Sequence, residues 1–148
     1  MQNQLKFFKD IYNYYDKGIH KNYEIDFNDM INYTYLVLTS KNAVEIFFNK
    51  LDEMNLDSRA LANLKICAVG SATAKEIKNN GINPDIVPEK FVAEYLFEEL
   101  KSVLKSTDKV LIPRTKNARD FLVNKISKIC SVKEVHIYQT VLNNINKD

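Results

Sequence analysis

The sequence has 148 residues, of which 45% are hydrophobic, and a formal net charge of +2. This length predicts one domain with a sizeable core, and so small a net charge does not point to nucleic acid or a membrane as a partner. No apolar run approaches the roughly 20 residues of a membrane span, and the start lacks the apolar centre of a signal peptide. Cys67, inside a strand-like run, and Cys130, behind a helix, are typical of reduced thiols, so we expect a cytoplasmic protein.

We expect residues 1–24 to form an N-terminal extension. An apolar face at helical spacing runs through Leu5, Phe8, Tyr12 and Tyr15. This face indicates a helix or a remnant of a neighbouring unit of structure, and the alternative is an aromatic surface that binds a partner. We expect the main α/β unit to span residues 25–141, beginning with a short helical turn, and a C-terminal tail to follow at residues 142–148.

From Tyr35 onward, predicted strands and helices alternate. Short apolar runs predict strands at residues 35–39, 65–69, 85–87, 109–112 and 135–141. Apolar residues at helical spacing predict helices at residues 42–54, 72–80, 91–104 and 118–129. We therefore predict an α/β fold, a three-layer α/β/α arrangement with a five-stranded parallel sheet in flavodoxin-like order. The last strand alternates polar and apolar residues more than the others, which predicts an edge position.

The turns that lead into the helices are rich in small, hydroxyl-bearing and basic residues. The carboxyl ends of parallel strands meet at one edge of a sheet, where helix N-termini present free N–H groups to anionic ligands. The candidate ligand-binding residues at this edge are Thr39, Ser40, Lys41, Asn42, Gly70, Ser71, Ala72, Thr73, Lys90, Pro113, Arg114 and Thr115. Each hydroxyl or amide side chain alone also fits a helix cap, a role open to Ser71, so only their convergence favours a site.

The residue pattern argues against several other kinds of site. His20 and His136 are far apart and lack metal-ligand spacing with cysteines or carboxylates. The sequence contains no Walker A loop, GxGxxG fingerprint, zinc pattern or nucleophile elbow. A response-regulator receiver has a similar alternation of elements, but it needs an acidic residue where the first predicted strand ends in Thr39.

Five segments match, in order and spacing, the motifs of one enzyme family. Residues 35–44 resemble an FTSxNAV segment, 68–74 a VGxxTA turn, 80–88 a GxxPDxVP stretch, 110–119 an LLPRGxxAR segment and 135–141 a VYxT strand. The family with this succession is uroporphyrinogen-III synthase. The chain departs from it at Thr115, where the family usually has glycine, which makes close approach of a ligand to that turn harder.

This resemblance implies a lobe of a larger enzyme. The family's enzymes have two α/β lobes with the active site in the cleft between them, and residues 25–141 resemble the continuous lobe. The implied reaction cyclises hydroxymethylbilane to uroporphyrinogen III, with inversion of the D ring and loss of water, in the biosynthesis of haem and other tetrapyrroles. It needs no metal or organic cofactor. Since a cleft needs two walls, we expect this hydro-lyase lobe to have little or no activity alone.

The resemblance also implies roles for two residues. Tyr138 matches the family's cleft tyrosine and could protonate the leaving hydroxyl, because a phenol with a pKa of ~10 is protonated at neutral pH. Thr73 would place a hydroxyl beside the substrate's carboxylates. Tyr138 could instead be an ordinary strand tyrosine. For the whole chain, the alternatives are a non-catalytic module that binds tetrapyrroles or other anions, and an interaction domain that needs a partner lobe or a second copy.

Overall fold

The structure is a computed structural model, and it describes residues 27–90, 92–115 and 119–138. The predicted N-terminal helix and the predicted tail at residues 142–148 lie outside the described residues. Within the described part, no helix is long and apolar enough to cross a membrane.

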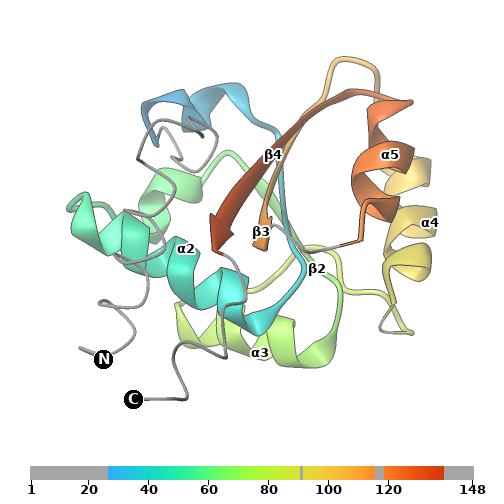
Figure 1. Cartoon of the computed structure of the whole chain (residues 1–148). Helices are drawn as coiled ribbons and strands as arrows, with labels where there is room; N and C mark the ends of the chain where they lie inside the picture. Colours follow the sequence, from blue (N-terminus) through green and yellow to red (C-terminus); the bar gives the residue numbers. More distant parts are fainter. Residues whose placement is uncertain (1–26, 91, 116–118, 139–148) are drawn as a thin grey trace.

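Helices and strands alternate along the described chain, as predicted. In order, the elements are η2 (Phe27–Asn32), β1 (Tyr35–Leu38), α2 (Lys41–Glu53), η3 (Ser58–Leu61), β2 (Lys65–Ala68), α3 (Ser71–Asn79), α4 (Ala93–Val103), β3 (Lys109–Thr115), α5 (Phe121–Ser127) and β4 (Ser131–Tyr138). The strands are parallel, in the order β2-β1-β3-β4, so the predicted edge position of the last strand is confirmed for the described sheet. Figure 1 shows α2 and α3 on one face and α4 and α5 on the other, which confirms the three-layer α/β fold.

Alternating strand side chains build two halves of a core. On β1, Leu36 and Leu38 join the cluster beneath α2 and α3, whereas Val37 joins the cluster beneath α4 and α5. All three are fully buried, as expected for a central parallel strand covered on both faces. Phe47 of α2 and Leu96 of α4 are also fully buried, one in each half. The carboxyl edge of the sheet is therefore held between two packed helix layers.

At residues 85–87, where a third strand was predicted, the structure differs from the expected topology. Only Ile86 bridges Cys67 of β2 in parallel, so the described sheet has four strands rather than five. Pro84 and Pro88 flank this segment, and proline lacks the N–H that a continuing ladder needs. The bridge lies outside β2 and not beside β1, whereas the flavodoxin-like order would place the third strand next to the first. That predicted order is wrong for the segment.

The two strands at the other end of the sheet are longer at one terminus than predicted. β4 begins at Ser131, and β3 continues to Thr115, where residue 112 was the predicted end. Pro113 lies beyond Val110 and Leu111, the residues of β3 that pair with β1. Pro113 pairs with Val135 of β4 only, so this part of β3 resembles an edge strand, where proline is tolerated. β3 therefore reaches farther toward the carboxyl edge than its apolar run suggests.

Gly81 follows α3 in a backbone conformation that favours glycine. Its φ is +88°, and its N–H and that of Ile82 donate to the carbonyls of Lys78 and Ile77, as in a Schellman motif. We expect Gly81→Ala to lower the free energy of unfolding by about 1 kcal/mol. Since nothing lies within 4 Å of an added Cβ, the loss would come from backbone strain.

Urea denaturation measures the effect of Gly81→Ala. The matched control is Lys75→Ala at an exposed position inside α3, which should stay within about 0.5 kcal/mol of the parent. Equal losses in the two variants would contradict a strained position at Gly81.

Candidate functional site

The carboxyl ends of the four strands meet at one edge of the sheet. β1 ends at Leu38 opposite Ala68, the last residue of β2, and β3 ends at Thr115 opposite Tyr138, the last residue of β4. Because every pair is parallel, the turns after these strands leave from the same edge (Figure 1). The structure thus brings the predicted residues of these turns to one rim, which we call the carboxyl edge, and places Tyr138 on it.

The turn after β1 forms the start of α2. Ser40 is the N-cap, and its Oγ accepts a hydrogen bond from the N–H of Ala43 at 3.1 Å. Lys41 is exposed and forms an ion pair with Glu45 at 3.9 Å, while Asn42 is exposed. The first turn of α2 contains no acidic residue. The positive end of the helix dipole is therefore not neutralised by a carboxylate within that turn.

The turn after β2 leaves the start of α3 open. Gly70 is the N-cap and offers no side-chain hydrogen bond, so a capping role for Ser71, which is the first residue of the helix, is wrong. Ser71 and Ala72 are exposed, whereas Thr73 is only 5% exposed and packs inward. No acidic residue lies in the first turn of α3. Backbone N–H groups at this end lack the side-chain acceptor that Ser, Asp or Asn at the N-cap supplies.

Lys90 belongs to the outer end of the carboxyl edge. The chain passes the Ile86 bridge in the same direction as the strands, outside β2, before it reaches Lys90. Lys90 is exposed, and its Nζ lies 5.1 Å from the centre of the Tyr95 ring on α4. A cation over an exposed ring is held weakly, so Lys90 is accessible to solvent and to anions.

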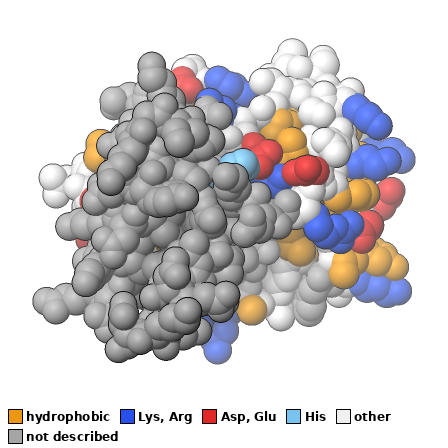
Figure 2. Space-filling model, in the orientation of Figure 1, with side chains coloured by type: hydrophobic (Ala, Val, Ile, Leu, Met, Phe, Trp, Pro, Cys, Tyr) orange, Lys and Arg blue, Asp and Glu red, His pale blue; other side chains and the backbone are white. Residues whose placement is uncertain are grey.

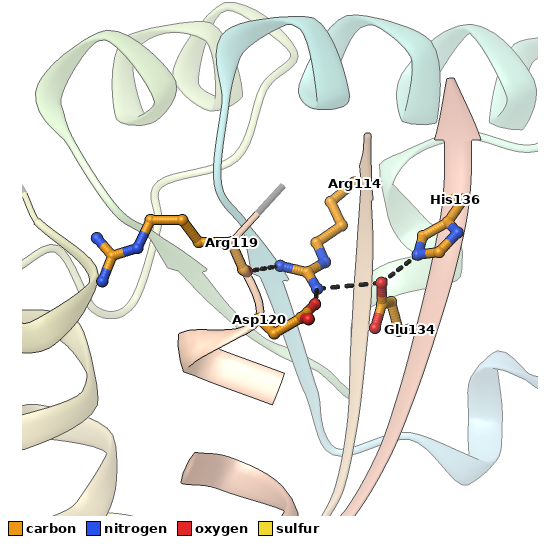
Figure 3. A network of polar contacts seen from close by, with 5 residues as sticks. All are labelled: Arg114, Arg119, Asp120, Glu134 and His136. Atoms are coloured by element: carbon orange, nitrogen blue, oxygen red, sulfur yellow. Dashed lines mark hydrogen bonds and ion pairs between the residues drawn. The ribbon is translucent and has the colours of Figure 1, made fainter. Parts of the chain in front are cut away.

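Arg114 lies inside a network of charged side chains. It is 3% exposed, and its preceding residue Pro113 is buried. Figure 3 shows Nη1 donating to the backbone carbonyl of Arg119 and Nη2 reaching Asp120 and Glu134. One oxygen of each carboxylate, Asp120 Oδ1 and Glu134 Oε1, lies 3.0 Å from Nη2. A ligand that contacted the terminal nitrogens of Arg114 would have to displace these partners.

Glu134 and His136 extend this network along β4. His136 pairs in register with Arg114, and its Nε2 contacts Glu134 Oε1 (Figure 3). Burial alone would raise the pKa of the Glu134 carboxyl, but the hydrogen bond with His136 and the Arg114 guanidinium outweigh burial and lower it. In Figure 2, the described histidine lies at the surface beside acidic and basic side chains. Glu134 is therefore an ionised partner of Arg114 at neutral pH.

The end of β4 is shifted against β3. Arg114 pairs with His136, but the next residue of β3, Thr115, pairs with Tyr138, so Ile137 is an extra residue between the two pairs. Such bulges bend a strand and re-aim the residues that follow, and they occur often beside functional sites. The irregularity thus falls at the candidate proton donor.

Other chemistry has little support among the described residues. The described part contains no group of three or more His, Cys, Asp or Glu residues that could hold a metal ion. Burial raises the pKa of the Cys67 thiol to about 12, and burial also raises the pKa of Cys130. Both cysteines are buried and form no disulfide with each other. Neither thiol is suited to act as a nucleophile at neutral pH, because the thiolate is the reactive form.

The fold and the edge geometry define an α/β lobe that presents the N-termini of helices along the carboxyl ends of parallel strands. A family profile described as Uroporphyrinogen-III synthase HemD matches residues 19–148. The chain belongs to the uroporphyrinogen-III synthase family.

Relatives in this family are longer than the chain. The Porphyrin biosynthesis protein HemD of Ruminiclostridium josui is 39% identical over 117 residues, which are 78% of this chain and 23% of that protein. A Methanocaldococcus jannaschii protein is 36% identical over 107 residues, covering 72% of this chain and 43% of that one. Thermus thermophilus uroporphyrinogen III synthase superposes with a TM-score of 0.60 at 16% identity, over 76% of this chain and 44% of that one. The chain thus spans less than half the length of these proteins, about one lobe.

The carboxylates of the charged network were not predicted from the sequence. Neither Asp120, six residues after Arg114, nor Glu134, on the next strand, belongs to the hydroxyl-rich turns that drew attention to this edge. One available signal was the strand alternation that puts Glu134 and His136 on one face of β4, next to a basic residue at the end of β3. That signal becomes informative only when the pairing of β3 with β4, and its register, are known.

Proposed function

We propose that this chain is the continuous lobe of a uroporphyrinogen-III synthase, and that its carboxyl edge binds the carboxylates of a linear tetrapyrrole. The observation that carries the proposal is the adjacency of the α2 and α3 N-termini, which follow neighbouring strands and have no acidic residue in either first turn. Helix N-termini attract carboxylates through free N–H groups and the helix dipole. Hydroxymethylbilane carries eight carboxylates, so it suits an extended rim of this kind.

The proposed site uses backbone groups more than charged side chains. The N–H groups at residues 41–42 and 70–73 would bind carboxylates, with the side chains of Thr39 and Ser40 beside them. Lys41 and Lys90 are exposed, so they can add positive charge from the solvent side. The end of β3, at Pro113 and Thr115, closes the row on that side. Holding both ends of the linear substrate in the inverted geometry would supply most of the rate gain.

The proposed reaction is the cyclisation that yields uroporphyrinogen III in tetrapyrrole biosynthesis. The hydroxyl of the hydroxymethyl group leaves as water, with the Tyr138 phenol donating the proton to the departing oxygen, and a cationic methylene remains. This methylene carbon would bond to the substituted α-carbon of the D ring, and the bond from that carbon to the C-ring methylene would then break. The released methylene would bond to the free α-carbon of the now inverted D ring, which loses a proton. The buried, free cysteines favour a reducing compartment, so we propose that the protein acts in the cytoplasm.

Two other functions would use the same lobe differently. A binding module would hold tetrapyrroles or other anions without turnover, and an interaction domain would contact a partner lobe or a second copy of the chain. The uncapped N-terminus of α3 favours the binding module over the interaction domain, because it is a feature suited to an anion. The cyclase proposal adds to this the proton donor at the end of β4.

Titration of the chain with porphyrins tests the proposed substrate class. We expect uroporphyrin, with eight carboxylates, to bind about tenfold more tightly than coproporphyrin, with four, because each contact at a helix N-terminus adds a few tenths of a kcal/mol. Raising the salt concentration should weaken both interactions. Equal affinities would contradict an edge whose affinity rises with the number of carboxylates. No binding at all would favour the interaction domain.

A parallel assay with hydroxymethylbilane tests the need for a second lobe. We expect the purified 148-residue chain to form little or no uroporphyrinogen III. Robust cyclisation by this chain alone would refute the two-wall requirement and leave the carboxyl edge as a sufficient site.

A further inference from the structure

Arg114 connects three separate parts of the fold. Its backbone lies in β3, its Nη1 donates to the carbonyl of Arg119 in the turn before α5, and its Nη2 reaches Asp120 and Glu134. Glu134 lies on the neighbouring strand β4 (Figure 3). Within the described residues, no other charged side chain is as deeply buried. The guanidinium therefore acts as a junction between β3, β4 and the start of α5.

Asp120 shows that this junction competes with ordinary helix capping. It occupies the N-cap position of α5, yet its side chain makes no capping hydrogen bond there and instead accepts from Arg114 at 3.0 Å. Aspartate at an N-cap usually accepts from the first helical N–H groups. The contact with Arg114 thus takes the place of a local interaction and fixes the turn to the sheet.

The junction extends to the opposite side of the turn. Arg119 Nη2 forms an ion pair with Glu94 of α4 at 2.9 Å, and its guanidinium carbon lies 5.6 Å from the centre of the Phe121 ring. The Phe121 ring in turn packs edge-on against Phe97 of α4. The turn that begins α5 is therefore held from β3 and β4 through Arg114, and from α4 through Arg119.

Glu134 is the partner that occupies Arg114 from the strand side. Its side chain is 23% exposed, and it contacts both Arg114 and His136. Two residues past His136, β4 ends at Tyr138, after the register shift. The contact between Glu134 and Arg114 thus lies directly before the bulge that sets the end of β4.

We infer that Arg114, held by Glu134, is a positioning residue: it fixes the turn before α5 and the end of β4 at the carboxyl edge, and it does not bind a substrate carboxylate itself. The inference rests on the proposed function for its effect on binding. A buried guanidinium whose two terminal nitrogens already have partners is poorly placed to take a new anion, whereas removal of one partner would loosen every segment it joins.

Glu134→Gln separates positioning from direct binding, because the two roles predict opposite effects. If Arg114 bound substrate, loss of the competing carboxylate would tighten uroporphyrin binding. Positioning predicts weaker binding, about fivefold, in the range typical of coupling between sites. Glu134→Asp, which keeps a shorter carboxylate, should recover part of the affinity. Tighter or unchanged binding by Glu134→Gln would overturn the inference.

Amide hydrogen exchange gives a second readout that does not depend on the ligand. We expect Glu134→Gln to speed exchange at residues 119–122 and 136–138 at least fivefold, while exchange in β1 stays as in the parent. Unchanged exchange at the first two segments would also overturn the inference. If the parent chain fails to bind uroporphyrin, the proposed function fails, and exchange alone decides whether Arg114 and Glu134 hold these segments.

Two further variants control for charge loss and for folding. Arg59→Gln removes an exposed arginine that pairs with Asp57 at 2.7 Å on η3, and it should change neither binding nor exchange at residues 119–122. The paired change Arg114→Met with Glu134→Met removes both charges, which often preserves stability where a single removal does not. If this double variant melts with the parent, it should still bind uroporphyrin about fivefold more weakly. Parent-like binding by a folded double variant would contradict the positioning role.

Discussion

Tyr138→Phe is expected to slow cyclisation of hydroxymethylbilane about a hundredfold in a two-lobe protein that contains this chain, the lower range for loss of a general acid. Tyr138 is the last residue of β4 and lies opposite Thr115 at the carboxyl edge. The substitution removes only the hydroxyl, so the fold and the binding of substrate should change little. Initial rates of uroporphyrinogen III formation, measured at saturating substrate, report the effect on kcat.

Tyr95→Phe provides the matched control for that experiment. Tyr95 lies on α4, is 44% exposed and has Lys90 over its ring, so loss of its hydroxyl should leave kcat within about twofold of the parent. A Tyr138→Phe enzyme with the parental rate would show that the tyrosine is structural. Proton donation would then have to come from another group or from solvent.

Phe47→Ala is expected to lower the free energy of unfolding by about 3–5 kcal/mol. Phe47 is fully buried in the cluster between α2 and the sheet, and its ring packs edge-on against Phe48 with centroids 5.6 Å apart. Removing the ring loses its transfer free energy and leaves a cavity that the two packed layers only partly fill. Because α2 begins at the carboxyl edge, a loosened α2 would also weaken the anion-binding rim.

Chemical denaturation of the Phe47 variants measures this loss. Phe47→Leu, which keeps most of the volume, should cost clearly less than Phe47→Ala. Ile31→Ala removes an apolar side chain that is 74% exposed, and it should stay within about 0.5 kcal/mol of the parent. A loss of less than about 1 kcal/mol for Phe47→Ala would contradict the packing described here.

The alternation of elements was predictable because its signals are local. The apolar run of β1 and the helical stripe of α2, including Val44 and Phe47, depend only on neighbouring residues, and the structure matches them to within one or two positions. The position of residues 85–87 depends on which side of β2 they pair, which no local pattern contains. Asp85 is an example. Its carboxylate accepts a hydrogen bond from the Ile66 N–H at 2.7 Å, so a side chain satisfies this backbone donor of β2.

The same distinction between local signals and long-range pairing applies to the candidate site. Convergence of the turns after β1 and β2 follows from parallel pairing, so residues such as Ser40 and Gly70 could be placed on one edge from the sequence. The direction of the Arg114 side chain could not, because it depends on Glu134 across the strand pair and on Asp120 after the turn. The sequence therefore locates the edge, whereas the structure decides which of its charges face inward.

Anion binding along the carboxyl edge is the central prediction for this chain. The most direct measurement is an amide chemical-shift titration of the ¹⁵N-labelled chain with uroporphyrin. We predict the largest shifts at residues 39–42 and 70–73, with smaller ones at Tyr138. Shifts concentrated at η2 and η3, which precede β1 and β2 at the opposite edge, or the absence of any shifts, would contradict it.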